Sequence, residues 1–138
     1  PKQLRSDEMS HIVKGQVQVA YKNKELLLKA LEGVGVVVEN EKLFRVGAGY
    51  TFEKYPIVLI DQNNKEHRIG YKEKNGVWEQ YQENYGSYGR WTQQASSKVQ
   101  DRYIAFHYEQ QLKEEGFSVT VKQHHDGTLE LEAEEAVW

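Results

Sequence analysis

The sequence contains no cysteine, which excludes disulfides, thiolate metal sites and cysteine nucleophiles. This absence suits a reducing compartment, and we therefore expect a cytoplasmic protein. An excess of basic residues is also missing, because 18 Lys and Arg stand against 21 Asp and Glu, for a formal net charge of −3. Proteins held mainly by nucleic-acid phosphates carry a basic stripe, so the composition argues against a nucleic-acid partner.

Long apolar runs are absent as well. The longest fully apolar stretches are Val36–Val38 and Pro56–Ile60, whereas a membrane-spanning helix needs about 18 consecutive apolar residues. We therefore expect no membrane partner. The length of 138 residues is that of a single domain.

The sequence offers no motif of a catalytic or metal site. It has no Gly-Lys-Ser/Thr phosphate-binding loop. His124 and His125 are adjacent on a predicted strand, so their side chains point to opposite faces and do not easily share a metal ion. Ser97 and His107 are separated by about 15 Å along a predicted helix, which excludes a Ser-His-Asp triad. We predict a protein that is not an enzyme and that uses no metal and no cofactor.

What the sequence does contain is a helix-to-strand connection that occurs twice. Residues 31–38 and 114–121 each combine the end of a helix, a glycine and a strand rich in β-branched residues. We predict that Gly33 and Gly116 both adopt the left-handed backbone that ends a helix. The chain is therefore expected to join helices tightly to β-hairpins.

Apolar periodicity predicts the elements of the first third of the chain. Residues 12–20 alternate between apolar and polar, as in a strand with one face in water. Asn23 is suited to cap a helix over residues 24–32. A strand over residues 36–41 follows, and a second short strand is expected over residues 43–46.

The middle of the chain predicts an antiparallel meander. Residues 55–61 form a strongly apolar strand, residues 67–73 a return strand and residues 77–83 a third strand. Asn75-Gly76 is a hairpin signal, because both residues tolerate positive φ.

A long second helix is expected from Thr92 to just before Gly116, about 36 Å in length. It carries one apolar stripe made of Ala95, Val99, Tyr103 and Phe106. A second stripe, displaced around the helix, consists of Ile104, Tyr108 and Leu112. Three explanations are open. The first half of the helix packs on one neighbour and the second half on another, or the second stripe is a contact for a partner or a second copy, or it is the drift of a single stripe around a 3.6-residue turn.

The end of the chain predicts a hairpin with a two-residue turn at Asp126-Gly127, between strands at residues 117–121 and 129–133. The fold class is therefore α+β, an antiparallel sheet with two helices packed on one face, in the order β-α-β-β-β-β-α-β-β. We interpret residues 9–138 as one domain. Residues 1–8 are interpreted as a tag remnant or disordered leader before Met9, the alternative being a natural tail.

Aromatic residues gather between the third meander strand and the long helix. We predict a binding surface here, formed by Trp78, Tyr85, Tyr88, Arg90 and Trp91, because aromatic rings beside a cation grip protein partners or stack on bases. In the alternative interpretation, Trp78 and some of the tyrosines face the core.

From Met9 onward the chain resembles the Ycf35 family of small proteins of chloroplast genomes, cyanobacteria and other bacteria. The resemblance rests on the order of short motifs: Met9-Ser10-His11, Leu28–Glu32, Ile69–Lys72, Asn75-Gly76, Tyr85-Gly86, Arg102-Tyr103, Leu112–Phe117 and Asp126–Thr128. The family has no established activity and no active-site residues. Its members are often encoded near AAA-type ATPases, which implies an accessory role and such an ATPase as the partner.

These observations lead to three hypotheses. The first is a non-enzymatic accessory module that binds a protein partner or itself, through the aromatic surface or through Tyr108 and Leu112. The second is a single-stranded nucleic-acid binder, with Arg90, Lys72 and Lys74 on phosphates. The third is a small-molecule pocket between the sheet and the helices.

Overall fold

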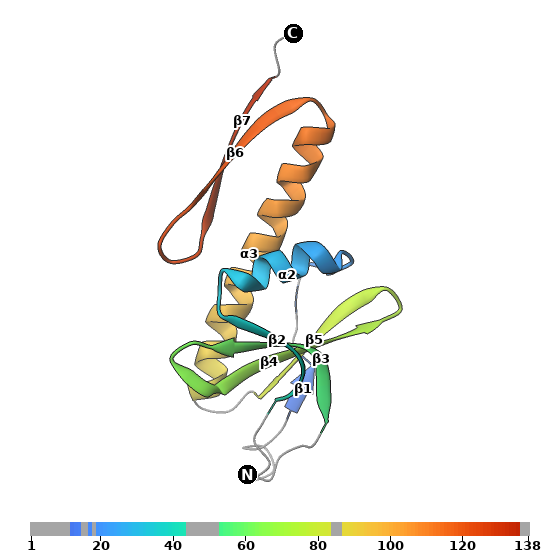
Figure 1. The fold of residues 1–138 in the computed structure, drawn as a ribbon, viewed down its shortest axis with the longest axis vertical. Helices are drawn as coiled ribbons and strands as arrows, with labels where there is room; N and C mark the ends of the chain where they lie inside the picture. Colours follow the sequence, from blue (N-terminus) through green and yellow to red (C-terminus); the bar gives the residue numbers. More distant parts are fainter. Residues whose placement is uncertain (1–11, 15–16, 18, 44–52, 84–86, 136–138) are drawn as a thin grey trace, which may run out of the picture.

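The computed structural model describes residues 12–14, 17, 19–43, 53–83 and 87–135. They form an α+β fold with the predicted order of elements (Figure 1). The helices are α2 (Lys24–Glu32) and α3 (Ser87–Glu114). The strands are β1 (Ile12–Lys14), β2 (Val36–Lys42), β3 (Lys54–Asp61), β4 (Asn64–Lys74), β5 (Val77–Glu83), β6 (Phe117–Gln123) and β7 (Leu129–Glu135).

Five strands form one antiparallel sheet in the order β1-β5-β4-β3-β2. Its centre is the predicted meander of β3, β4 and β5, and β1 and β2 pair at the two edges. The turn between β4 and β5 has φ 55° at Asn75 and 81° at Gly76. Positive φ at both residues is what a two-residue hairpin turn of this type requires, so the hairpin signal is confirmed.

The main core lies between this sheet and both helices. Its buried helical residues are Leu26, Leu27, Ala30 and Leu31 from α2, and Ala95, Val99, Tyr103 and Phe106 from α3. They pack against alternate residues of the central strands, including Ile57, Leu59, Ile69 and Tyr71. Both helices therefore cover the same face of the sheet, as predicted, and the first stripe of α3 faces the core.

The last two strands form a separate two-stranded sheet, which the sequence did not predict. Figure 1 shows this hairpin along the part of α3 that extends away from the five-stranded sheet. α3 has 28 residues and is therefore about 42 Å long, more than the sheet can cover. The β6–β7 hairpin packs along the part of α3 that lies beyond the sheet. We call this part of α3 together with the hairpin the arm.

Two predicted boundaries are wrong by five residues or more. β1 ends at Lys14 rather than at residue 20. Val17 and Val19 are instead partly buried against the core, so their alternation reflects packing rather than strand pairing. α3 begins at Ser87 and not at Thr92, because packing against the core overrides the low helix propensity of glycine near its start. Residues 1–8, and residues 44–46 of the predicted short strand, lie outside the described residues.

The predicted two-residue turn of the last hairpin is also wrong. The N–H of His124 donates to the Thr128 carbonyl, and the N–H of Gly127 donates to the His124 carbonyl, both at 2.9 Å. Gly127 has φ 91°, which makes a three-residue loop with a bulge. The Asp126 carboxylate supports this loop by accepting hydrogen bonds from the Thr128 N–H (3.0 Å) and hydroxyl (2.6 Å).

Candidate functional site

One buried arginine ties the hairpin to both helices. Arg102 lies on α3 and is 4% exposed. Its guanidinium donates to the carbonyls of Ala30 (2.8 Å) and Lys29 (3.2 Å), which belong to the last turn of α2, where carbonyls lack helical partners. It also donates to the Gln123 amide oxygen (2.9 Å) and the Gly127 carbonyl (2.7 Å) at the hairpin tip. Arg102 thus joins α2, α3 and the hairpin.

Two glycines leave space for the Arg102 guanidinium and for the hairpin tip that it binds. Gly33 has φ −88°, so the predicted left-handed conformation is wrong here. A Cβ on Gly33 would lie 2.0 Å from the Arg102 Cζ, and the guanidinium is therefore what requires glycine. A Cβ on Gly127 would lie 3.0 Å from the Gly33 carbonyl oxygen. Gly116 has φ 96° and adopts the left-handed conformation as predicted. Burial lowers the pKa of Arg102, and the Glu32 carboxylate opposes this effect.

Trp78 does not belong to an exposed surface. It is 7% exposed and lies in the main core. The backbone N–H of Trp78 donates to the Tyr21 carbonyl at 2.8 Å, and the Lys24 ammonium lies 5.6 Å from the Trp78 ring centroid. The prediction of Trp78 as a binding residue is therefore corrected, and the alternative interpretation, that it faces the core, is right for this residue.

The rest of the predicted aromatic surface is only partly described. Tyr85 and the side chain of Tyr88 lie outside the described residues. Arg90 is exposed in the first turn of α3. Trp91 is half-buried, and its ring stacks on that of His67 with centroids 5.6 Å apart. Trp91 therefore contacts β4, and within the described part of the chain no single surface unites the predicted aromatic residues.

The other predicted contact residues lie on the arm. Tyr108 is 53% exposed and Ile104, one turn earlier, is 47% exposed, whereas Leu112 is half-buried. Asp101, Ile104, Tyr108 and Gln111 are all exposed, and their spacing places them on one face of α3. We call these four residues the α3 strip. It has an apolar centre and a polar residue at each end.

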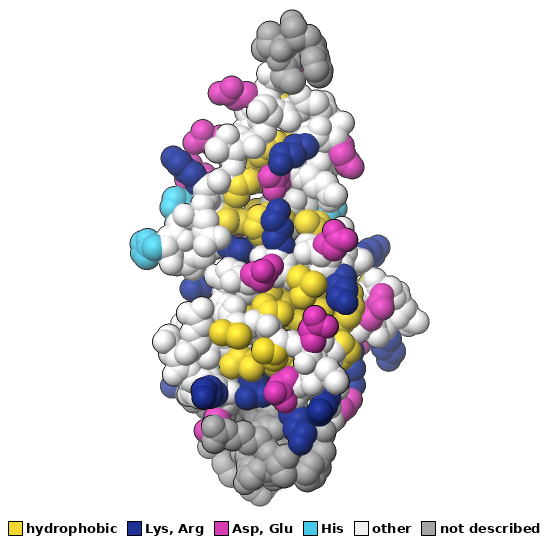
Figure 2. Space-filling view, viewed as in Figure 1, with side chains coloured by type: hydrophobic (Ala, Val, Ile, Leu, Met, Phe, Trp, Pro, Cys, Tyr) yellow, Lys and Arg dark blue, Asp and Glu magenta, His cyan; other side chains and the backbone are white. Residues whose placement is uncertain are grey.

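Few large apolar side chains are exposed in the described part of the chain, and two of them lie on this strip. On the face shown in Figure 2, apolar atoms reach the surface in two groups, over α2 and the sheet below it and over the arm, with charged residues among them. In the part of the chain that the structure describes, the large apolar side chains that are exposed are Val36, Ile104 and Tyr108. Two of these three are neighbours on α3.

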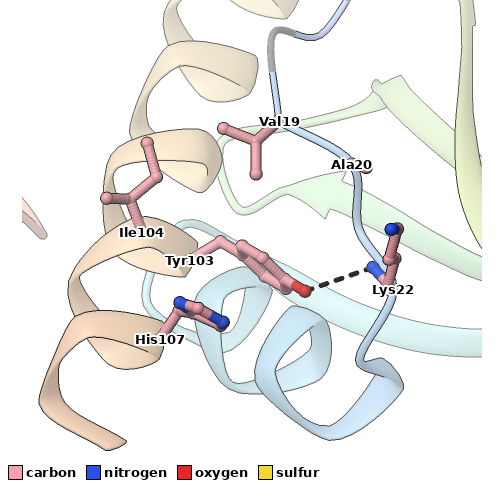
Figure 3. Close-up of a pocket in the computed structure, with 6 residues that line it drawn as sticks. All are labelled: Val19, Ala20, Lys22, Tyr103, Ile104 and His107. Carbon is pink, nitrogen blue, oxygen red and sulfur yellow. Dashed lines mark hydrogen bonds between the residues drawn. The ribbon is translucent and has the colours of Figure 1, made fainter. Parts of the chain in front are cut away.

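A pocket of about 290 Å³ lies beside the strip (Figure 3). The Tyr103 hydroxyl accepts hydrogen bonds from the N–H groups of Lys22 (3.2 Å) and Asn23 (3.1 Å), which fixes the segment before α2 against α3. The rings of Tyr103 and His107 stack at 6.5 Å. Ile104 belongs to both the pocket and the strip, so the two form one surface. The complete lining is Val19, Ala20, Lys22, Tyr103, Ile104 and His107.

The walls of this pocket are mostly apolar or aromatic, and Lys22 and His107 add hydrogen-bonding groups. Such a site can hold an apolar or aromatic side chain and bind a polar atom at its end. Tyr21 belongs to the same segment before α2, but its side chain points into the core. Its ring centroid lies 4.9 Å from that of Tyr103. Burial raises the pKa of the Tyr21 hydroxyl.

The structure offers no metal-binding cluster among its described residues. None of the described helices is long and apolar enough to cross a bilayer. Of the cations proposed to meet phosphates, Lys72 pairs with Glu53. The Lys72 ammonium also lies 4.9 and 5.1 Å from the rings of Tyr55 and Tyr81. Tyr55 is 3% exposed, so its ring is not open to a base.

Sequence reasoning missed the pocket. Its two walls are about 80 residues apart in the chain, and it lies between α3 and the segment before α2, not between the sheet and the helices as hypothesised. The available signal is Val19, which lines the pocket, but its place in an alternating segment predicts a strand instead. Comparison of the chain with protein-family models, with curated proteins and with solved structures finds no match. The site is therefore interpreted from its own geometry.

Proposed function

We propose that this protein is a non-enzymatic accessory module that binds a protein partner through the α3 strip and the pocket beside it. The observation that carries this proposal is the position of two exposed apolar side chains, Ile104 and Tyr108, next to an open pocket with apolar walls. Protein interfaces are centred on anchors of this kind, where an aromatic or aliphatic side chain enters a pocket.

The pocket is also preformed, which favours binding. The hydroxyl of Tyr103 fixes the backbone of Lys22 and Asn23, so the wall opposite α3 does not have to be ordered when a partner arrives. Ordering of interface segments is a main cost of association. A fixed wall removes that cost from this part of the interface.

Two partners are compatible with this role. The resemblance to the Ycf35 family favours an AAA-type ATPase, because members are often encoded near such enzymes. A second copy of the chain is the other. The absence of cysteine suits a module that works in the cytoplasm.

Photo-crosslinking tests the proposal in cells. Tyr108 is replaced by benzoylphenylalanine, and the control places the same residue at Thr120, which is exposed on β6. We expect a covalent adduct of defined mass from position 108 and none from position 120. Ile104→Asp in the same chain should abolish the adduct, because it places a charge in the apolar centre of the strip. Absence of any adduct at position 108, or equal adducts at both positions, would reject the proposal.

A further inference from the structure

We infer that the occupant of this site is a second copy of the chain, and that Tyr108 of each copy enters the pocket of the other. This inference rests on the proposed function and specifies its partner. The two α3 helices would cross antiparallel about a two-fold axis. Each copy would then contribute one side chain to complete the other's site.

The spacing of the strip supports this reciprocal arrangement. In a two-fold contact, if residue i meets residue j, then j also meets i. An antiparallel crossing centred midway between Ile104 and Tyr108 sets each of them opposite the other residue of the second copy. Ile104 forms the edge of the pocket, so Tyr108 of the second copy reaches the pocket at that point. One axis therefore fills both pockets.

The polar residues at the two ends of the strip favour the same axis. With the crossing centred between residues 104 and 108, Asp101 of one copy faces Gln111 of the other, because both lie equally far from the centre. An acidic side chain then meets a neutral amide that can donate a hydrogen bond to it. A parallel pairing in register would set Asp101 against Asp101, and facing like charges disfavour a contact.

The polar groups of the pocket suit a tyrosine. A phenol has an apolar ring and a hydroxyl that finds a hydrogen-bond partner when buried. Tyr103, Ile104 and Val19 provide surfaces for the ring, and the His107 imidazole can bind the hydroxyl (Figure 3). Tyr108 matches these groups, and it is the most exposed large apolar side chain in the part of the chain that is described.

Light scattering over a range of concentrations is the first test. The wild-type chain should reach twice its mass of 16.1 kDa, whereas Tyr108→Ala and Ile104→Ala should remain at the single mass. Val36→Ala is the matched control, because Val36 is 45% exposed but lies on β2, away from the strip. Circular dichroism verifies that all three variants are folded. A wild-type chain that stays at the single mass, or a Val36→Ala variant that loses the dimer equally, would overturn the inference.

Charge variants and cross-linking test the axis itself. Gln111→Lys should tighten the dimer and Gln111→Glu should weaken it, each by roughly two- to fivefold, because the new charge faces Asp101. In the cysteine-free background, a short bismaleimide should join a mixture of Asp101→Cys and Gln111→Cys chains. Either variant alone should cross-link poorly, since like positions are separated by about 15 Å along the helices. Equal cross-linking of each variant alone would overturn the antiparallel pairing.

The failure of this inference is distinguishable from that of the proposed function. A chain that stays at the single mass, together with a foreign protein joined to benzoylphenylalanine at position 108, would overturn the second copy as occupant and leave the binding module intact. A chain that stays at the single mass and gives no adduct would overturn both.

Discussion

Replacement of Arg102 by methionine should detach the hairpin from the body of the molecule. Methionine keeps a long side chain that can replace the apolar stem of arginine, but Arg102→Met removes all four hydrogen bonds of the guanidinium. The carbonyls of Ala30 and Gly127 would lose their donor in buried surroundings. The contact between α2, α3 and the hairpin tip would then depend on apolar packing alone.

The magnitude follows from two opposing terms. A hydrogen bond to a charged group contributes about 1.5–3 kcal/mol, so four such bonds give about 6–12 kcal/mol before other terms are counted. The burial of a guanidinium offsets several kcal/mol of this gain. Water can also replace the donor at the Lys29 carbonyl, which is only partly buried. We expect Arg102→Met to lower the free energy of unfolding by about 3–5 kcal/mol, a large part of the stability of a typical domain.

Urea denaturation gives the total loss, and amide hydrogen exchange locates it. The amides of His124 and Gly127, which are bonded within the hairpin loop, should exchange much faster in Arg102→Met, while those of the β3–β4 pair should exchange faster by no more than the global loss that urea measures. Gln123→Ala removes only one acceptor of Arg102 and should lower the free energy of unfolding by about 1–2 kcal/mol. A loss below about 1 kcal/mol in Arg102→Met, or unchanged exchange at His124 and Gly127, would refute the role of Arg102 in holding the hairpin to both helices.

Three further changes probe the interior and the hairpin loop. Tyr21→Phe should raise the free energy of unfolding by about 1 kcal/mol, because the Tyr21 hydroxyl is buried with no hydrogen-bond partner among the described residues; a less stable variant in urea would contradict this. Gly33→Ala should cost about 2–4 kcal/mol, since its Cβ overlaps the Arg102 guanidinium, and a double-mutant cycle should show that most of this cost vanishes in Arg102→Met. The pKa of Asp126 is lowered by its hydrogen bonds from Thr128. Its contribution to stability should therefore be fully present above the ordinary pKa of 3.8 and be lost as the pH falls through the lower native pKa. Asp126→Asn should remove this pH dependence in acid denaturation, and an unchanged acid profile would count against it.

Local signals in the sequence predicted local structure well. Asn23 caps α2, and its side-chain oxygen accepts a hydrogen bond from the Leu26 N–H at 3.1 Å. The bounds of α2 and β5 agree with the prediction. The turn at Asn75-Gly76 was also predictable, because this dipeptide tolerates positive φ at both residues. In each case the determining residues are neighbours in the chain.

Features that depend on distant contacts could not be predicted in this way. Gly33 resembles Gly116 in its sequence surroundings, but a side chain about 70 residues away imposes the glycine at position 33. Gln80 is 1% exposed. Its amide oxygen accepts hydrogen bonds from the Tyr71 hydroxyl (3.3 Å) and the Ser96 hydroxyl (3.2 Å). A polar residue on a strand normally indicates a wet face, so this interior network had no signal in the periodicity of the chain.

Arg102 and Tyr103 connect the architecture to the proposed site. They are consecutive on α3 and hold opposite ends of α2: Arg102 binds the carbonyls of its last turn, and the Tyr103 hydroxyl binds the N–H of its cap, Asn23. Arg102 also binds the hairpin tip, and Tyr103 forms a wall of the pocket. We expect that the pocket is rigid only when α2 is fixed at both ends. Arg102→Met should weaken binding at the α3 strip although Arg102 does not line the pocket, and unchanged cross-linking from position 108 in this variant would show that the pocket is independent of the Arg102 hydrogen bonds.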